Sequence, residues 1–425
     1  MKEIKLNGLN ESIFYDTCKN GLKVYFWVNK KVSTYYATLS VGYGSVYSNF
    51  KIKNKNYSSP LGVAHFLEHL KFNEKGGTTA HDYYNKAGCD TNAFTTFNYT
   101  NYQVLGAEDA KKNIIHLLDF VQSDYFTKKL VKNEKGIIIE EAKMGEDDPY
   151  TVMLFRLFNN MFPNYPYKDL ITGSPKDVKD TTFDDIKLVF DTFYHPKNMF
   201  LVVTGNFNPY EIMEAVKKNQ DKKEFLEYLN PKRIIPKEND EVGVEYEELD
   251  LNLQNEIIKI GIKIPRKNFK KYNEILIRVY LNTLLRANFG STSLFKDELE
   301  ENELIESLYP TMEIYDDYVA IIITINSMYK DEIINRFKEK LNNLDISEET
   351  FNRMKKANIA SLVLDYEDVV YVNSVLQNEI LSYDKIISNM KEIYEDLNYE
   401  EMQDILKCIS TKNMSILVGN KKEEE

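Results

Sequence analysis

The sequence contains few of the features that mark disulfide-rich, secreted or membrane-spanning proteins. Its three cysteines, Cys18, Cys89 and Cys408, are far apart and form no C-x-x-C pair. This argues against a disulfide framework and a thiolate metal site, and it fits a reducing compartment. The N-terminus has no apolar run typical of a signal peptide, and no stretch reaches the ~18 apolar residues of a membrane span. We therefore expect a soluble, cytoplasmic protein.

Net positive charge is also lacking, because 66 Asp and Glu outnumber 54 Lys and Arg and give a formal net charge of −12. A net acid is repelled by nucleic acids and by anionic membranes, so neither is expected as the main partner, and cationic or neutral peptides suit the chain better. Apolar material is ample, with 43% hydrophobic and 13% aromatic residues. At 425 residues the chain is too long for one ordinary core, so two domains are expected.

Segments of two kinds alternate along the chain. Runs rich in β-branched and aromatic residues predict strands at 22–28, 34–43 and 199–205. Apolar residues at helical spacing predict helices around His65 and at 80–86, 108–122, 129–144 and 209–217.

A charged, proline-containing stretch at 218–242 is the expected linker between an N-terminal zinc-bearing domain, 1–217, and a C-terminal domain without a metal motif, 243–425. The tripeptide Lys197-Asn-Met recurs at Lys412-Asn-Met, each time before a strand-like run. The repeat indicates duplication, and we expect two similar α+β halves.

The segment His65-Phe-Leu-Glu68-His69 places two of the five histidines four residues apart. On a helix these two share a face, so both rings can bind one Zn²⁺ ion. Glu68 is then placed to hold a water molecule as general base. The alternative is two histidines satisfied by ordinary hydrogen bonds. The apolar neighbours Val63 and Phe66 weigh against it, because buried imidazoles and a buried carboxylate are costly without a partner.

A catalytic zinc ion needs a third protein ligand. The predicted helix at 131–144 carries Glu134 and Glu141, which are seven residues apart and fall on one face, whereas Glu140 is turned about 100° away. We expect Glu141 to be the ligand and Glu134 to orient a histidine or the water. A solvated run of charges is the other interpretation of this helix.

Taken together, these residues resemble the inverzincins of the pitrilysin, insulinase and mitochondrial-processing-peptidase type, whose signature is H-x-x-E-H. The likeness covers nearly the whole chain, most strongly its first half, and looks closest to the small bacterial two-domain branch, whose members often work in pairs. It rests on His65–His69, Asn92–Thr95, Glu134–Glu141, Glu146–Pro149 and Phe193–Met199.

The resemblance implies a zinc endopeptidase built from two homologous domains, each a mainly antiparallel sheet covered by helices. It implies His65, His69 and Glu141 as zinc ligands, Glu68 as base and Glu134 as auxiliary carboxylate. It also implies that an extended peptide binds as an added strand along Asn92, Ala93, Phe94 and Thr95, through main-chain hydrogen bonds that tolerate varied side chains.

The second half departs from the family pattern. Self-sufficient members bring an Arg and a Tyr to the substrate from the form L-F-x-x-x-R-x-x-x-G-L-x-Y, but here Leu299 and Glu306 stand at those positions. Because such donors are commonly worth a few kcal/mol of barrier, we expect a dimer, either a heterodimer with a similar subunit that supplies the Arg and Tyr or a homodimer. Alternatively, Arg286 or a tyrosine near Tyr309 substitutes.

Two functions of different classes follow. The first is a zinc metalloendopeptidase subunit that cuts extended peptides or processes precursors. The second is a non-catalytic or partner-dependent subunit that holds or matures a peptide. His81, His116 and His195 are expected at the surface or in packing positions and not at the metal.

Overall fold

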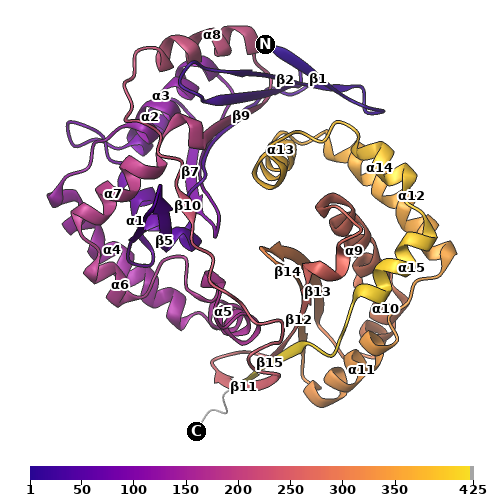
Figure 1. Cartoon of the computed structure of the whole chain (residues 1–425). Coiled ribbons are helices and arrows are strands. Elements are labelled where there is room, and N and C mark those ends of the chain that lie inside the picture. Colours follow the sequence, from indigo (N-terminus) through magenta and orange to yellow (C-terminus); the bar gives the residue numbers. More distant parts are fainter. Residues whose placement is uncertain (422–425) are drawn as a thin grey trace. The chain divides into compact units, whose positions relative to one another are not determined.

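The computed structural model describes residues 1–421, which divide into two units (Figure 1). Unit 1 comprises Met1–Met144, Asp169–Ile235 and Val363–Met390, and unit 2 comprises Gly145–Lys168, Pro236–Leu362 and the segment from Lys391 onward. The expected boundaries, 1–217, 218–242 and 243–425, describe contiguous halves. In the structure each unit also contains a segment from the other half of the chain.

The sheet of unit 1 has seven strands in the order β1-β2-β3-β9-β4-β8-β7. Only β3 and β9 pair in parallel; the other neighbours are antiparallel. The strands are β1 (Lys2–Leu6), β2 (Glu11–Thr17), β3 (Lys23–Val28), β4 (Tyr35–Val41), β7 (Asp90–Thr95), β8 (Thr100–Gly106) and β9 (Met199–Gly205).

Helices cover both faces of this sheet. Alternate residues of β4, such as Ala37 and Leu39, belong to a core shared with α1 and α3, whereas Tyr36 belongs to a second core shared with α13. This alternation is the period of two expected for a strand buried on both sides. The helices are α1 (Val63–Lys71), α2 (Ala80–Lys86), α3 (Ala110–Gln122), α4 (Lys128–Asp147), α6 (Pro175–Asp180), α7 (Phe183–Phe193), α8 (Pro209–Gln220) and α13 (Val369–Tyr383).

Unit 2 contains a five-stranded sheet in the order β11-β15-β12-β14-β13. Its strands are β11 (Tyr246–Leu251), β12 (Glu256–Pro265), β13 (Ser307–Tyr315), β14 (Tyr318–Ser327) and β15 (Met414–Lys421). The remaining helices are α5 (Pro149–Met161), α9 (Glu274–Phe289), α10 (Leu294–Glu301), α11 (Lys330–Asn342), α12 (Glu348–Asp365), α14 (Met390–Asp396) and α15 (Tyr399–Cys408).

The two sheets repeat one topology. In unit 1 the order β3-β9-β4-β8-β7 has one parallel pair followed by three antiparallel pairs, and β11-β15-β12-β14-β13 in unit 2 has the same directions in the same order. The predicted fold, two homologous α+β domains with mainly antiparallel sheets, is therefore confirmed.

Short elements complete the described chain. The basic segment at 51–57 lies in a hairpin of β5 (Asn49–Ile52) and β6 (Lys55–Ser58), and β10 (Lys232–Arg233) from the expected linker pairs with β5. The 3-10 turns are η1 (Ser45–Ser48), η2 (Pro166–Lys168), η3 (Pro196–Asn198) and η4 (Arg266–Phe269). Within residues 1–421, no helix combines the length and apolar character needed to cross a bilayer.

Candidate metal centre

The helix that carries the H-x-x-E-H segment starts at a glycine turn. Gly62 has a φ of 79°, and a Cβ atom there would overlap the carbonyl oxygen of Thr172, so only glycine fits before the first turn of α1. Val63, Ala64, Phe66 and Leu67 are then buried, as their apolar pattern predicts. This burial anchors the helix and takes the polar residues that share it into the protein.

His65 and His69 meet on one face of α1 together with Glu141 from α4. Nε2 of His65 lies 3.4 Å from Oε1 of Glu141, and Nε2 of His69 lies 3.3 Å from Oε2 of the same carboxylate. One ligand atom from each residue lies within 4.8 Å of the others, and among residues 1–421 no other group of three or more His, Cys, Asp or Glu side chains does so.

Glu134 lies two turns before Glu141 on α4 and contacts Nδ1 of His69, the ring nitrogen that does not face Glu141. Its Oε1 is 3.1 Å from Nδ1 of His69. This contact fixes the ring, so that Nε2 of His69 faces Glu141, which is how histidine ligands are commonly oriented. Glu140 is exposed and accepts a hydrogen bond from Lys143 instead. The arrangement is the one that helical spacing predicts.

Glu68 is buried beside the two histidines. Burial raises the pKa of its carboxyl group, against the opposing effects of His65, Thr95 and His69. The hydroxyl of Thr95 donates a 2.6 Å hydrogen bond to Oε2 of Glu68. Oε1 has no such partner within the described chain, so it remains able to bind water.

The charges around the histidines favour a cation. Burial alone lowers the pKa of His69, but the hydrogen bond with Glu134 and the charges of Glu141 and Glu68 outweigh it and raise the pKa. The hydrogen bond from His65 holds the pKa of Glu141 below its usual value despite partial burial. Three carboxylates around two imidazoles therefore stabilise positive charge at their centre.

The donor set fits zinc. Two imidazole nitrogens and one carboxylate oxygen, with a place left for water, form the set typical of catalytic zinc, and ligands ~2 Å from a tetrahedral ion lie roughly 3.3 Å apart. The two nitrogen-to-oxygen distances of 3.4 and 3.3 Å agree with that spacing. Nδ1 of His65 is buried and has no hydrogen-bond partner within residues 1–421, whereas Nδ1 of His69 faces Glu134.

Strand β7 passes beside α1 and is the last strand of its sheet, so one row of its backbone N–H and C=O groups faces no other strand of the described chain. Its side chains alternate. Ala93 and Thr95 are half-buried, with Thr95 against Glu68, while Asn92 and Phe94 alternate with them and are exposed. The role of Thr95 as hydrogen-bond donor to Glu68 was not predicted, because sequence alone does not place β7 against α1.

The other histidines lie outside the metal cluster. His81 stacks on Phe72, and His116 stacks on Tyr83 and lies 3.1 Å from a carboxylate oxygen of Glu74. His195 caps η3, with Nδ1 accepting a hydrogen bond from the backbone N–H of Lys197.

The two departures from the family pattern lie on unit 2. Leu299 is fully buried, and Glu306 is exposed and accepts a hydrogen bond from Asn255. Of the two suggested substitutes, Arg286 donates to Asn358, and Tyr309 is 63% exposed on β13.

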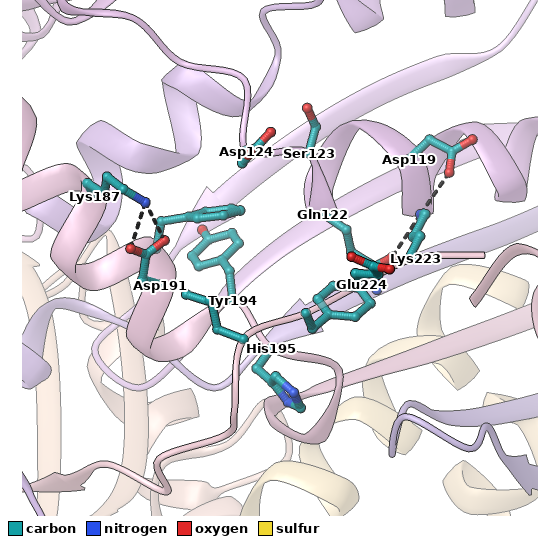
Figure 2. Close-up of a pocket in the computed structure, with 13 residues that line it drawn as sticks. Asp119, Gln122, Ser123, Asp124, Lys187, Asp191, Tyr194, His195, Lys223 and Glu224 are labelled. Carbon is teal, nitrogen blue, oxygen red and sulfur yellow. Dashed lines mark hydrogen bonds and ion pairs between the residues drawn. The ribbon is translucent and has the colours of Figure 1, made fainter. Parts of the chain in front are cut away.

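A cavity of about 540 Å³ lies elsewhere on unit 1, between the end of α3, α7 and the segment after α8 (Figure 2). Lys187 pairs with Asp191 and Lys223 with Asp119 across its walls. None of the metal-cluster residues lines it, so it is separate from the candidate centre.

Two family models match adjacent parts of the chain. One, described as insulinase (peptidase family M16), matches residues 26–174, and the other, described as the peptidase M16 inactive domain, matches residues 180–358. YmfH of Bacillus subtilis, named an uncharacterized zinc protease, is 34% identical over 73% of this chain and 72% of its own length. The chain belongs to the M16 peptidase family.

Solved structures of M16 proteins share its fold. The crystal structure of a candidate M16-like peptidase from Alicyclobacillus acidocaldarius has a TM-score of 0.91 and 25% identity, over 98% of this chain and 100% of that one. Pitrilysin has a TM-score of 0.76 at 16% identity, with all of this chain matching 47% of pitrilysin, a likeness of fold alone. The predicted resemblance to a two-domain member of this family is confirmed.

Proposed function

We propose that the chain is the metal-bearing subunit of a zinc metalloendopeptidase that hydrolyses extended peptides. The observation that carries the proposal is the meeting of His65, His69 and Glu141, with Glu68 beside them, in a chain of the M16 family. In this proposal the first three residues hold zinc. When bound, zinc supplies Lewis-acid polarisation of water and of the peptide carbonyl.

Each remaining residue of the centre has a separate task. Glu68 takes a proton from the attacking water at Oε1 and passes it to the leaving amine, while Thr95 holds Oε2. Glu134 fixes the ring of His69 through Nδ1. The peptide lies along the free edge of β7, at Asn92, Ala93, Phe94 and Thr95, where backbone hydrogen bonds hold it regardless of most side chains.

The first test is metal analysis of the purified chain, followed by peptide cleavage by the chain alone and together with a similar subunit that supplies Arg and Tyr. We expect about one zinc ion per chain, lost on mutation of the ligands. Glu68→Gln should retain the zinc and lower the cleavage rate by roughly 10²–10⁴-fold, because the base is lost and the ligands are kept. Absence of a transition metal, or a rate unchanged in Glu68→Gln under conditions in which the original chain cleaves, would refute the proposal.

Partner dependence is the second part of the proposal. Leu299 is buried and Glu306 carries negative charge, so neither position offers a donor to a peptide carbonyl or an oxyanion. A similar subunit with Arg and Tyr at these positions would complete the site. Mixing the chain with such a subunit should then raise cleavage by orders of magnitude, whereas strong activity of the isolated chain would refute the dependence.

The same two residues favour the competing function, a subunit that binds or matures a peptide without cutting it. Its signature is peptide binding without cleavage both in the isolated chain and in the mixture. Cytoplasmic location stays a prediction from composition.

A further inference from the structure

A small basic sheet lies directly before the helix of the metal centre. Strands β10, β5 and β6 form it, and its exposed side chains include four lysines. We call this group the lysine sheet; its lysines are Lys51, Lys53, Lys55 and Lys232.

These lysines are not neutralised by their surroundings. None of the four has a carboxylate within ion-pair distance among residues 1–421. The segment 17–67, which contains the hairpin, has seven lysines and no Asp or Glu, although the chain as a whole carries a net charge of −12. Lys19 and Lys23 of this segment pair with Asp221 and Asp384, and the three lysines of the hairpin are among the five that do not pair with a carboxylate in the described chain.

Two of the lysines face each other across the strands. Lys232 of β10 and Lys51 of β5 are direct partners in the antiparallel register. Like charges in this position destabilise a sheet, and the neighbouring exposed residues of the hairpin, such as Asn56 opposite Lys51, supply no negative charge. A bound anion would relieve this repulsion.

The lysine sheet is attached to the end of the proposed peptide-binding strand. The turn η1 leads into β5, and its backbone N–H groups at Ser45 and Val46 donate 3.0 Å hydrogen bonds to the carbonyl oxygens of Thr96 and Phe97, just after β7. A Cβ at Gly44 would lie within 2.6 Å of backbone atoms of Thr96, Phe97 and Tyr99, so the close approach requires glycine there. The lysine sheet is therefore attached to the end of β7 through backbone contacts.

We propose that the lysine sheet binds an acidic segment of the peptide substrate while the part to be cut lies along β7. This rests on the proposed function and adds to it a substrate class, peptides with a run of Asp or Glu several residues from the scissile bond. It refines the expectation from net charge, which favours cationic or neutral peptides for the chain as a whole. Charge complementarity and backbone continuity with β7 support it.

An anionic membrane is the less suitable occupant. Binding to a lipid surface generally combines basic residues with apolar side chains that enter the interface. No large apolar side chain within residues 49–58 is exposed.

The test measures binding and cleavage of two matched fluorescent peptides. Both peptides share an apolar ten-residue core. One carries a tail of four Glu and the other a tail of four Gln, and each is made in two versions, with the tail at the N-terminus or at the C-terminus. With Glu68→Gln to prevent turnover, we expect the Glu-tailed peptide to bind roughly tenfold more tightly at low salt, with the preference lost near 0.5 M NaCl because surface charges are screened.

Charge reversal on the sheet is the decisive variant. Lys51→Glu with Lys232→Glu should abolish or invert the preference, and it keeps the like-charge pairing, so its folding is matched to the original. The control, Lys356→Glu with Lys412→Glu, makes the same change in net charge at two exposed lysines of unit 2 and should keep the preference. Zinc content and cleavage of the Gln-tailed peptide should be unchanged in both.

The outcomes separate the two proposals. A preference lost only in the sheet variant supports the acidic-segment site. No preference in the original chain, or one that survives charge reversal, overturns it even if cleavage is normal. Lysine-dependent binding to vesicles of phosphatidylglycerol without a peptide preference also overturns it, in favour of a membrane contact. Absence of zinc-dependent cleavage of both peptides even with a similar subunit that supplies Arg and Tyr refutes the proposed function instead.

Discussion

The two units have the same strand order but different chemistry. All five histidines lie at or before residue 195, and α1 of unit 1 carries two of them, whereas α9 of unit 2 carries none. The sheets are alike because alternation of apolar residues and strand pairing specify them. The metal cluster depends on His65, His69 and Glu141, and the histidines it needs occur in unit 1 alone. A fold of this kind can therefore be duplicated while its site exists once.

The two units also differ in how one helix packs on the sheet, α13 in unit 1 and α5 in unit 2. In unit 1, α13 meets β4 and β9 through a buried polar network in which Asn373 contacts Thr38, Thr204 and Gln377. In unit 2, α5 meets β12 and β15 through methionines against glycines, with Met161 beside Gly261 and Met153 beside Gly419. The network requires one position for α13, whereas apolar contacts adapt to small changes.

The largest effect is expected where the units differ most, at the metal. Glu134→Gln removes the partner that orients His69 and should lower zinc affinity by roughly 10- to 100-fold. Glu141→Gln removes the carboxylate ligand itself and should lower the affinity by more than that. Zinc titration with a competing chelator measures both. The control is Glu140→Gln on the same helix, where the carboxylate accepts a hydrogen bond from Lys143. Equal affinities in Glu141→Gln and Glu140→Gln would contradict the assignment.

The next effect tests the polar network. Asn373→Leu should lower the free energy of unfolding of unit 1 by about 3 kcal/mol, because the hydroxyl of Thr38 and the amide of Gln377 lose a buried acceptor. Trp27, the only tryptophan, lies in the core shared with α13, so its fluorescence in urea reports this unit. Ser374→Ala, at an exposed site on the same helix, should change stability little.

The corresponding change in unit 2 should be smaller. Met161→Leu conserves volume at a fully buried position of α5, so we expect it to lower the free energy of unfolding by less than about 1.5 kcal/mol. Circular dichroism in urea measures this change. If it destabilises the chain as much as Asn373→Leu, the two interfaces do not differ in the way described.

Sequence spacing predicted the local parts of the candidate centre. The intervals from His65 to His69 and from Glu134 to Glu141 fix which side chains share a helix face, and helical geometry is nearly invariant. The contact between Thr95 and Glu68 was out of reach because it depends on packing between a helix and a strand. The positions of α5 and α13 could not be predicted for the same reason. Each helix packs on the sheet formed by the opposite half of the chain, through contacts between residues far apart in sequence.

Buried carboxylates provide the last difference between the units. Glu238 of unit 2 lies 3.2 Å from the ammonium group of Lys263, and both side chains are fully buried. Glu379 of unit 1 is buried on α13, accepts a 2.9 Å hydrogen bond from the backbone N–H of Ile387, and has no cation beside it in the described chain. Burial raises the pKa of Glu379 to about 7, against the effect of that hydrogen bond.

The pH dependence follows from this difference. A carboxyl group whose pKa is near 4.5 unfolded and about 7 folded binds its proton more tightly in the folded state. Its contribution to stability is complete below pH 4.5 and is lost as the pH rises through 7, a change of at most about 3 kcal/mol. The free energy of unfolding of Glu379→Gln should therefore match that of the original chain near pH 5 and exceed it at pH 8. Trp27 fluorescence in urea measures both. Glu367→Gln, at an exposed site, should leave the profile unchanged, and parallel profiles for Glu379→Gln and the original chain would show that Glu379 stays ionised when buried.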